Sequence, residues 1–156
     1  MKLIELFPPS EPCQCEVCRS YCARPGWWTV KEFESVLLTP FYKRVMLEVA
    51  PEMTFGVLSP AFNGCENHFA LQQFSKNKCC FFKNGLCELA EVQLMPLECR
   101  YCHHDRKGKG LDCHNAIEKE WHSAEGASLI ESWMEKIRFP YKDYYRQILA
   151  ESVMRR

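Results

Sequence analysis

The feature that most constrains this chain is the crowding of cysteines between Cys79 and His104. Five cysteines and two histidines occupy these 26 residues. A single buried cysteine packs as a small hydrophobic residue, but several cysteines at short spacing are typical of metal ligands. We therefore expect the fold to bring sulfur atoms together around metal.

A second cysteine cluster lies near the start of the chain, in the pattern C-x-C-x2-C-x3-C. Two sets of four cysteines result: Cys13, Cys15, Cys18 and Cys22 (the first motif), and Cys80, Cys87, Cys99 and Cys102 (the second motif). Four thiolates suffice for a closed zinc site or a four-iron cluster. The sequence does not assign a given cysteine to a given site, so the two sets can interleave. Further candidate ligands are Cys79, Cys113, His103, His104 and His114.

Composition narrows the setting and the partners. The chain has 156 residues, 47% of them apolar, which is enough for one domain over residues 1–156. Twenty basic residues balance twenty acidic ones, so we expect no nucleic-acid partner. No run approaches the roughly 18 apolar residues of a membrane helix, so we expect no membrane partner. The first residues lack a signal-peptide pattern, which favours the cytoplasm, where cysteines bind metal rather than form disulfides.

The first half of the chain predicts an extended arm and short helices. Pro8, Pro9 and Pro12 favour an extended segment over residues 1–12. Thr29 followed by Glu32 is a capping-box pattern, so a helix is expected from about residue 30. Pro40 is expected to open a second helix, residues 53–64 to be irregular or extended, and residues 66–76 to be weakly helical. The apolar residues assigned to the second helix are Phe41, Val45, Met46 and Val49.

The second motif predicts a hairpin followed by a short helix. Asn84-Gly85 is a strong signal for a two-residue turn, which would bring Cys80 close to Cys87. Pro96 is expected to open a short helix that places Cys99 and Cys102 on one face.

The C-terminal residues 112–156 predict two helices. Asp112 is expected to cap a long helix with Gly126 as a tolerated weak point, and a last helix is expected over about 141–154. The apolar stripe of the long helix is Ile117, Trp121, Ala124, Ala127, Ile130, Met134 and Ile137, and the inward residues of the last helix are Tyr144, Ile148 and Val153.

Other cysteine chemistries fit these residues less well. Cys99-x2-Cys102-His103 matches a c-type haem attachment motif, but that attachment requires export. The same pair could form a thioredoxin-like redox site, yet the surrounding alternation of strands and helices is missing. The spacing from Cys15 to Cys22 is the reverse of the radical-SAM triad, and two neighbouring C-x2-C knuckles of a zinc ribbon are not present.

Residues 13–104 resemble the YkgJ-like, or CxxCxxCC, zinc- or iron-chelating domain family. Cys15, Cys18 and Cys22 match the first, second and last cysteines of its first motif, with Tyr21 in place of the third. Cys80-Phe-Phe-Lys-Asn-Gly-Leu-Cys87, followed by Pro96 and Cys99-Arg100, matches its second motif, in which Met95 replaces an arginine and Cys102 is an additional sulfur. The resemblance implies binding of zinc or iron and implies little about activity, although one arm of the family resembles flagellin lysine methylases.

We therefore predict a mainly α, small helical domain with a short β-hairpin, stapled by cysteine-ligated metal. The expected function is metal binding, with a 4Fe-4S cluster favoured over zinc because the knuckle spacing of common zinc modules is missing. The surest ligands are Cys80, Cys87 and Cys99, joined by Cys15, Cys18 and Cys22. The alternatives are a structural zinc module that presents its helices to a protein partner, and an enzyme that uses the metal, near His103 and His104, on a small substrate or a protein side chain.

Overall fold

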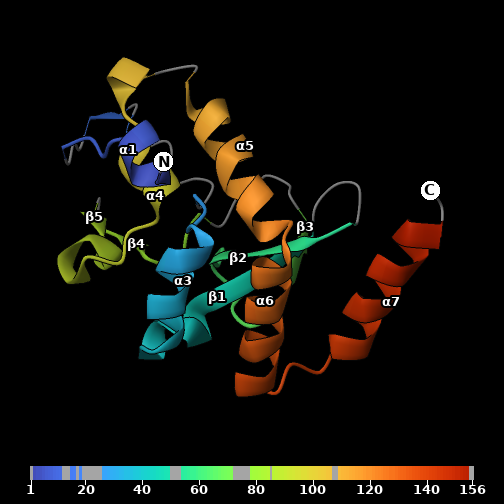
Figure 1. Cartoon of the computed structure of the whole chain (residues 1–156). Coiled ribbons are helices and arrows are strands. Elements are labelled where there is room, and N and C mark those ends of the chain that lie inside the picture. The colour runs from blue at the N-terminus through green and yellow to red at the C-terminus, as the bar shows by residue number, and fades with distance from the viewer. Residues whose placement is uncertain are drawn as a thin grey trace.

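The computed structural model describes residues 2–11, 15, 16, 18, 26–49, 54–71, 78–84, 86–106 and 109–154. This part of the chain is mainly helical, with one three-stranded sheet and a short hairpin (Figure 1). The helices are α1 (Leu3–Leu6), α3 (Val30–Leu37), α4 (Leu97–Tyr101), α5 (Gly110–Trp121), α6 (Ala124–Lys136) and α7 (Lys142–Met154). The strands are β1 (Val45–Val49), β2 (Gly56–Pro60), β3 (Phe69–Leu71), β4 (Phe82–Lys83) and β5 (Leu86–Cys87). Short 3-10 turns cover Pro40–Arg44, Glu88–Val92 and His104–Arg106.

The sheet has the order β2-β1-β3, with β1 at its centre. β1 pairs antiparallel with β2, where Leu47 lies opposite Leu58, and parallel with β3, where Leu47 lies opposite Phe69. The prediction of a helix through Val45 and Val49 is therefore wrong, as is the weak helix over Phe69–Leu71. Every residue of β1 is buried, and a short apolar run that is buried on both faces lacks the alternation that distinguishes a strand from a buried helix.

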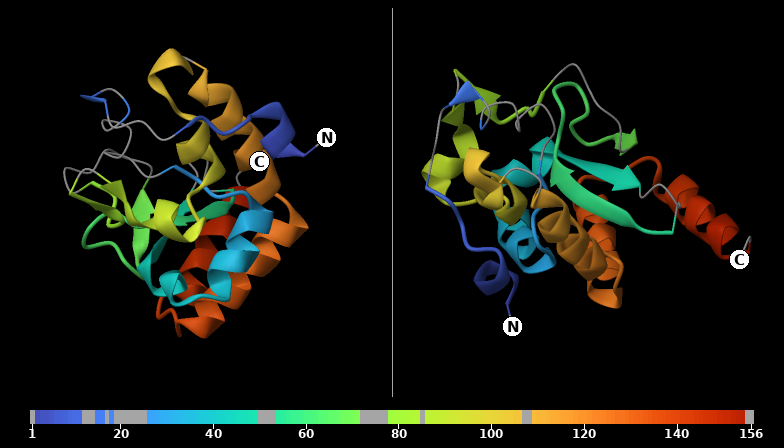
Figure 2. Two further views of the ribbon diagram at one scale, coloured as in Figure 1. Left: turned by 90° about the vertical axis from the view of Figure 1, so that its left-hand side faces the viewer. Right: turned by 90° about the horizontal axis from the view of Figure 1, so that it is seen from above.

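A layer of three helices covers the sheet. α3, α5 and α6 contact one another, and α5 and α6 also contact β2 (Figures 1 and 2). The core of this packing contains the four tryptophans of the chain, all buried. Each indole N–H has a hydrogen-bond acceptor, as buried polar groups require. Trp28 donates to Leu94 O, Trp121 to Trp28 O and Trp133 to Tyr42 O, while Trp27 donates to the buried carboxylate of Glu48.

The predicted Thr29 cap and the hairpin are confirmed, whereas the predicted Asp112 cap is wrong, because α5 begins at Gly110 and Asp112 lies in its first turn. Thr29 Oγ1 accepts from the backbone N–H of Glu32, and the Glu32 carboxylate accepts from the backbone N–H of Thr29, which is the capping box that opens α3. Pro96 directly precedes α4. β4 and β5 form the expected hairpin, and Asn84 in its turn has φ of 54°. Gly85, the second residue of the predicted turn, lies outside the described residues.

Other predicted elements need correction. The single long helix is two helices, because Ser123 caps α6 through a hydrogen bond from the N–H of Gly126. In α7 it is Tyr145 that is buried, while Tyr144 is exposed. The N-terminal arm contains α1 where only extended structure was expected. None of the helices in the described part of the chain is both long and apolar enough to cross a membrane.

Candidate functional site

Most of the described cysteines lie on elements at one end of the molecule. Figures 1 and 2 show that α1, α4, the β4–β5 hairpin and the described residues of the first motif all lie at the end opposite α7. Cys80 and Cys87 belong to the hairpin region, Cys99 and Cys102 to α4 and its C-terminal cap. Cys113 lies in the first turns of α5, which packs against α4.

Both ends of the segment that carries the first motif are attached to α4. Before the motif, the backbone N–H and the hydroxyl of Ser10 donate to the carbonyl of Arg100, at 2.7 and 2.8 Å. After the motif, the backbone N–H of Trp27 donates to Glu98 Oε1 at 2.8 Å, and the N–H of Glu98 reaches Trp27 O at 3.4 Å. The described residues on either side of the first motif, Ser10 and Trp27, therefore both lie beside the helix that carries Cys99.

Gly26, four residues after Cys22, lies directly against Cys99 of the second motif. A Cβ atom at Gly26 would lie 2.6 Å from Cys99 Sγ and 2.9 Å from the backbone nitrogen of Cys99. Real Cβ atoms do not come this close to other heavy atoms, so only glycine fits at this position without a shift of the surrounding chain. The absence of a side chain therefore permits close packing between Cys99 and the chain that follows the first motif.

Within the first motif, the described residues show a local turn around a sulfur atom. The backbone N–H of Cys18 points to Cys15 Sγ, at 3.4 Å. An N–H directed at sulfur stabilises a thiolate, because hydrogen bonding to the charged form favours that form. The contact brings the backbone of Cys18 to the sulfur of Cys15. Cys13 and Cys22, also predicted as ligands, lie outside the described residues.

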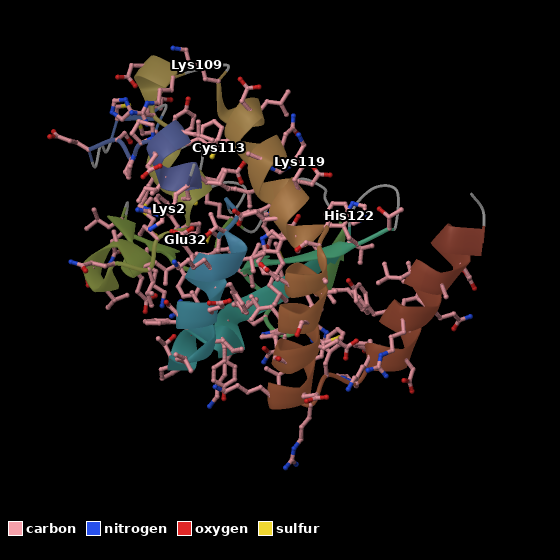
Figure 3. The ribbon with its side chains drawn as sticks, in the orientation of Figure 1. Lys2, Glu32, Lys109, Cys113, Lys119 and His122 are labelled. Carbon is pink, nitrogen blue, oxygen red and sulfur yellow. The ribbon has the colours of Figure 1, made fainter. Side chains whose placement is uncertain are left out.

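Cys102, which is half-buried, and Cys113, which is buried, influence each other electrostatically beside α4. Burial, and then the negative charge of Glu98, raises the pKa of each thiol to about 12. Cys18 also raises the pKa of Cys102, and Cys102 raises that of Cys113, so these sulfurs are electrostatic neighbours. Figure 3 shows the Cys113 sulfur on the side of α5 that faces α4. Such thiols are protonated at neutral pH, and a bound cation would displace their protons.

The hairpin cysteines have a different environment. The Cys80 thiol is buried and donates to the carbonyl of Arg44 at 3.6 Å. Burial raises its pKa to about 11, although the Arg44 guanidinium opposes the shift. Burial also raises the pKa of Cys87. Hydrogen bonds from the backbone N–H groups of Leu89 and Ala90 oppose this increase. In the described structure Cys80 thus packs as a core thiol, whereas Cys87 already receives N–H groups directed at its sulfur.

Two residues that sequence reasoning did not place in the site contribute to its geometry. Glu98, directly before Cys99, accepts from Trp27 through Oε1, and its Oε2 lies 2.8 Å from Nδ1 of His114. His114 was considered only as one of several reserve ligands. Of the predicted polar candidates, His103 contacts Asp105, with Nδ1 2.5 Å from Oδ1. The position of Glu98 beside a predicted ligand was the available signal, but its partners are far away in the sequence.

Over the described residues, no group of three or more cysteine, histidine, aspartate or glutamate side chains has the geometry to hold a metal ion. Donors of suitable chemistry are therefore gathered at one end of the molecule, but the described sulfurs do not by themselves complete a coordination shell. The predicted ligand set stays a prediction.

Comparison of the chain with models of protein families, with curated proteins and with solved structures finds no match in any of the three.

Proposed function

We propose that this protein binds iron or zinc through cysteine thiolates of its two motifs, with a 4Fe-4S cluster as the favoured form. The observation that carries the proposal is the attachment to α4 of the chain on both sides of the first motif. Ser10 and Trp27, on either side of the motif, each bond to residues adjacent to Cys99. These contacts support a site shared by the two motifs, because they hold the chain that flanks the first motif beside a cysteine of the second.

Chain length limits how far the remaining ligands can lie. Cys13 follows Ser10 by three residues and Cys22 precedes Gly26 by four. At no more than about 3.6 Å per residue, Cys13 is within about 11 Å of Ser10 and Cys22 within about 14 Å of Gly26. These limits are compatible with ligands from both motifs at one site, as the proposal requires.

Thiolates are the donors that select zinc and iron–sulfur clusters over hard cations such as Mg²⁺. A metal bound here would join the first motif to α4, so part of its binding free energy would stabilise the fold. We place the protein in the cytoplasm, where reducing conditions keep thiols available as ligands. Zinc in a closed four-sulfur shell remains the alternative, and it would make the site a structural one.

Serine substitution tests the ligand assignment. Cys87→Ser and Cys99→Ser replace a soft thiolate by a hydroxyl of similar size, so each should lose bound metal and lower the denaturant midpoint of the loaded protein. Cys65→Ser is the matched control, because Cys65 belongs to neither motif and its thiol is half-buried. Metal content by elemental analysis is the readout. Full metal content in both ligand variants would show that the assignment is wrong.

A further inference from the structure

Glu98, on α4, contacts two of the segments that neighbour other cysteines. It directly precedes Cys99, and its side chain is only 13% exposed. Both carboxylate oxygens have partners at hydrogen-bond distance: Oε1 accepts from the backbone N–H of Trp27, and Oε2 contacts His114 Nδ1, each at 2.8 Å. A carboxylate in such a half-buried setting holds its partners more firmly than an exposed one.

The two partners of Glu98 belong to two further cysteine-bearing segments. Trp27 is joined through Gly26 to the first motif, and His114 directly follows Cys113 in α5. The rings of Trp27 and His114 also lie against each other, with centroids 3.9 Å apart and planes at 31°. A single carboxylate therefore connects the chain that follows the first motif, the helix of the second motif and the start of α5.

We infer that Glu98 is a positioning residue of the proposed metal site, one that fixes Cys99 and Cys102 relative to the first motif and α5 without itself binding the metal. This inference rests on the proposed function. Outer groups that orient ligands typically affect metal affinity by about 10- to 100-fold. Glu98 is suited to this role because one partner is a backbone N–H and the other is a histidine ring packed against Trp27. Neither partner can move without a shift of the surrounding structure.

The electrostatics of the site agree with this placement. The negative charge of Glu98 raises the pKa of both Cys102 and Cys113, second only to burial. The carboxylate is thus close to two sulfurs as well as to the backbone of Cys99. The negative charge of Glu98 would also attract a cation bound to these sulfurs, in addition to the effect of Glu98 on the orientation of the ligands.

Zinc titration of the full-length chain tests the inference. The metal-free protein and its variants would be titrated with Zn²⁺ in competition with a chromogenic chelator, and the urea midpoint of each metal-free variant would be measured in parallel. Glu98→Ala should weaken Zn²⁺ binding by about 10- to 100-fold. Glu98→Gln should recover part of the loss, because its amide oxygen still accepts from Trp27.

Glu120→Ala and Glu120→Gln are the matched controls. Glu120, on the last turn of α5, accepts from the backbone N–H of Val30 at 3.2 Å and so makes the same kind of contact with the chain just after Trp27. These controls should lower the urea midpoint of the metal-free protein but leave Zn²⁺ affinity unchanged.

Two results would overturn the inference while leaving metal binding intact. One is a Glu98→Ala variant that binds Zn²⁺ as tightly as the parent. The other is an equal loss of affinity in the Glu98 and Glu120 variants that follows their loss of metal-free stability, which would give Glu98 a structural role only. Failure of the parent chain to bind Zn²⁺, and also to take up iron and sulfide when they are supplied without oxygen, would instead reject the proposed function, and this inference with it.

Discussion

At the scale of single residues, Gly26 has little freedom to change. A side chain there would meet both the sulfur and the backbone nitrogen of Cys99. Gly110 differs, since a Cβ atom there would lie 3.4 Å from Cys102 Sγ, an ordinary contact. Close packing against a cysteine therefore excludes a side chain at Gly26 but not at Gly110.

We predict that Gly26→Ala destabilises the protein by about 1–3 kcal/mol, because backbone atoms have to shift to admit the methyl group. It should also reduce the affinity for metal, since the shift displaces Cys99. Gly110→Ala should be close to neutral. Urea unfolding of metal-free and loaded protein gives both quantities. A Gly26→Ala variant with the parent's midpoint would show that the two motifs are not in close contact.

The Glu88–Arg44 pair gives a second prediction at this scale. Arg44 contacts both carboxylate oxygens of Glu88, at 2.9 and 2.8 Å, and this lowers the pKa of Glu88. A lowered folded-state pKa contributes stability above the unfolded value of about 4.3, and that contribution is lost as the pH falls through the folded-state pKa. Glu88→Gln should therefore flatten the loss of stability below about pH 4.3.

Denaturant unfolding from neutral to acid pH measures this contribution. Because both side chains are partly exposed, we expect a modest effect that decreases at high salt. Arg44→Gln should flatten the same limb of the curve. Parallel curves for the parent and the two variants would mean that the pair does not contribute to stability.

Residue-level chemistry was partly predictable from sequence. The Thr29–Glu32 capping box is local and was found from a spacing of three residues. Glu32 also accepts from the backbone N–H of Leu97 and pairs with Arg100, which joins α3 to α4. That second role depends on which segments meet in the fold. Local spacing does not contain this information, and the roles of Glu98 and Gly26 were missed for the same reason.

At the scale of elements, the turn between α5 and α6 illustrates a limit of periodicity. Apolar residues at steps of three and four continue from Ile117 to Ile137, which predicts one helix. The chain breaks at His122 and Ser123, but both helices bury residues of this series against the same core. The apolar stripe therefore continues across the break between the two helices. Ser123, a residue type that favours the N-cap position, was the local indication of this break.

Gly126 makes this turn possible, although the sequence suggested only a tolerated weak point. A Cβ atom at Gly126 would lie 2.4 Å from the carbonyl oxygen of Trp121. We predict that Gly126→Ala costs at least about 1–3 kcal/mol, whereas alanine normally stabilises a helix interior by about 1 kcal/mol relative to glycine. Ser128→Ala, at an exposed position of α6, is the control and should be near neutral. Thermal unfolding decides, and a stabilised Gly126→Ala variant would contradict the geometry of the turn.

At the scale of the whole molecule, α4 connects segments from across the chain. Arg100 accepts hydrogen bonds from the N-terminal arm, and Leu97 donates to Glu32 at the start of α3. Glu98 accepts from Trp27, which follows the first motif. Arg106, shortly after α4, donates to Pro8 O at 2.6 Å and extends the contact with the arm. A five-residue helix has little stability of its own. Its position therefore depends on these contacts and, in our proposal, on metal.

The measurement that tests metal binding most directly is made on protein purified without oxygen. Iron, zinc and acid-labile sulfide would be quantified together with a visible absorption spectrum. We predict near-stoichiometric metal, with a brown colour and iron matching sulfide if the favoured cluster is present, and colourless protein with zinc for the alternative. Folded, stable protein that contains only traces of either metal, and that takes up neither when supplied, would contradict the proposal.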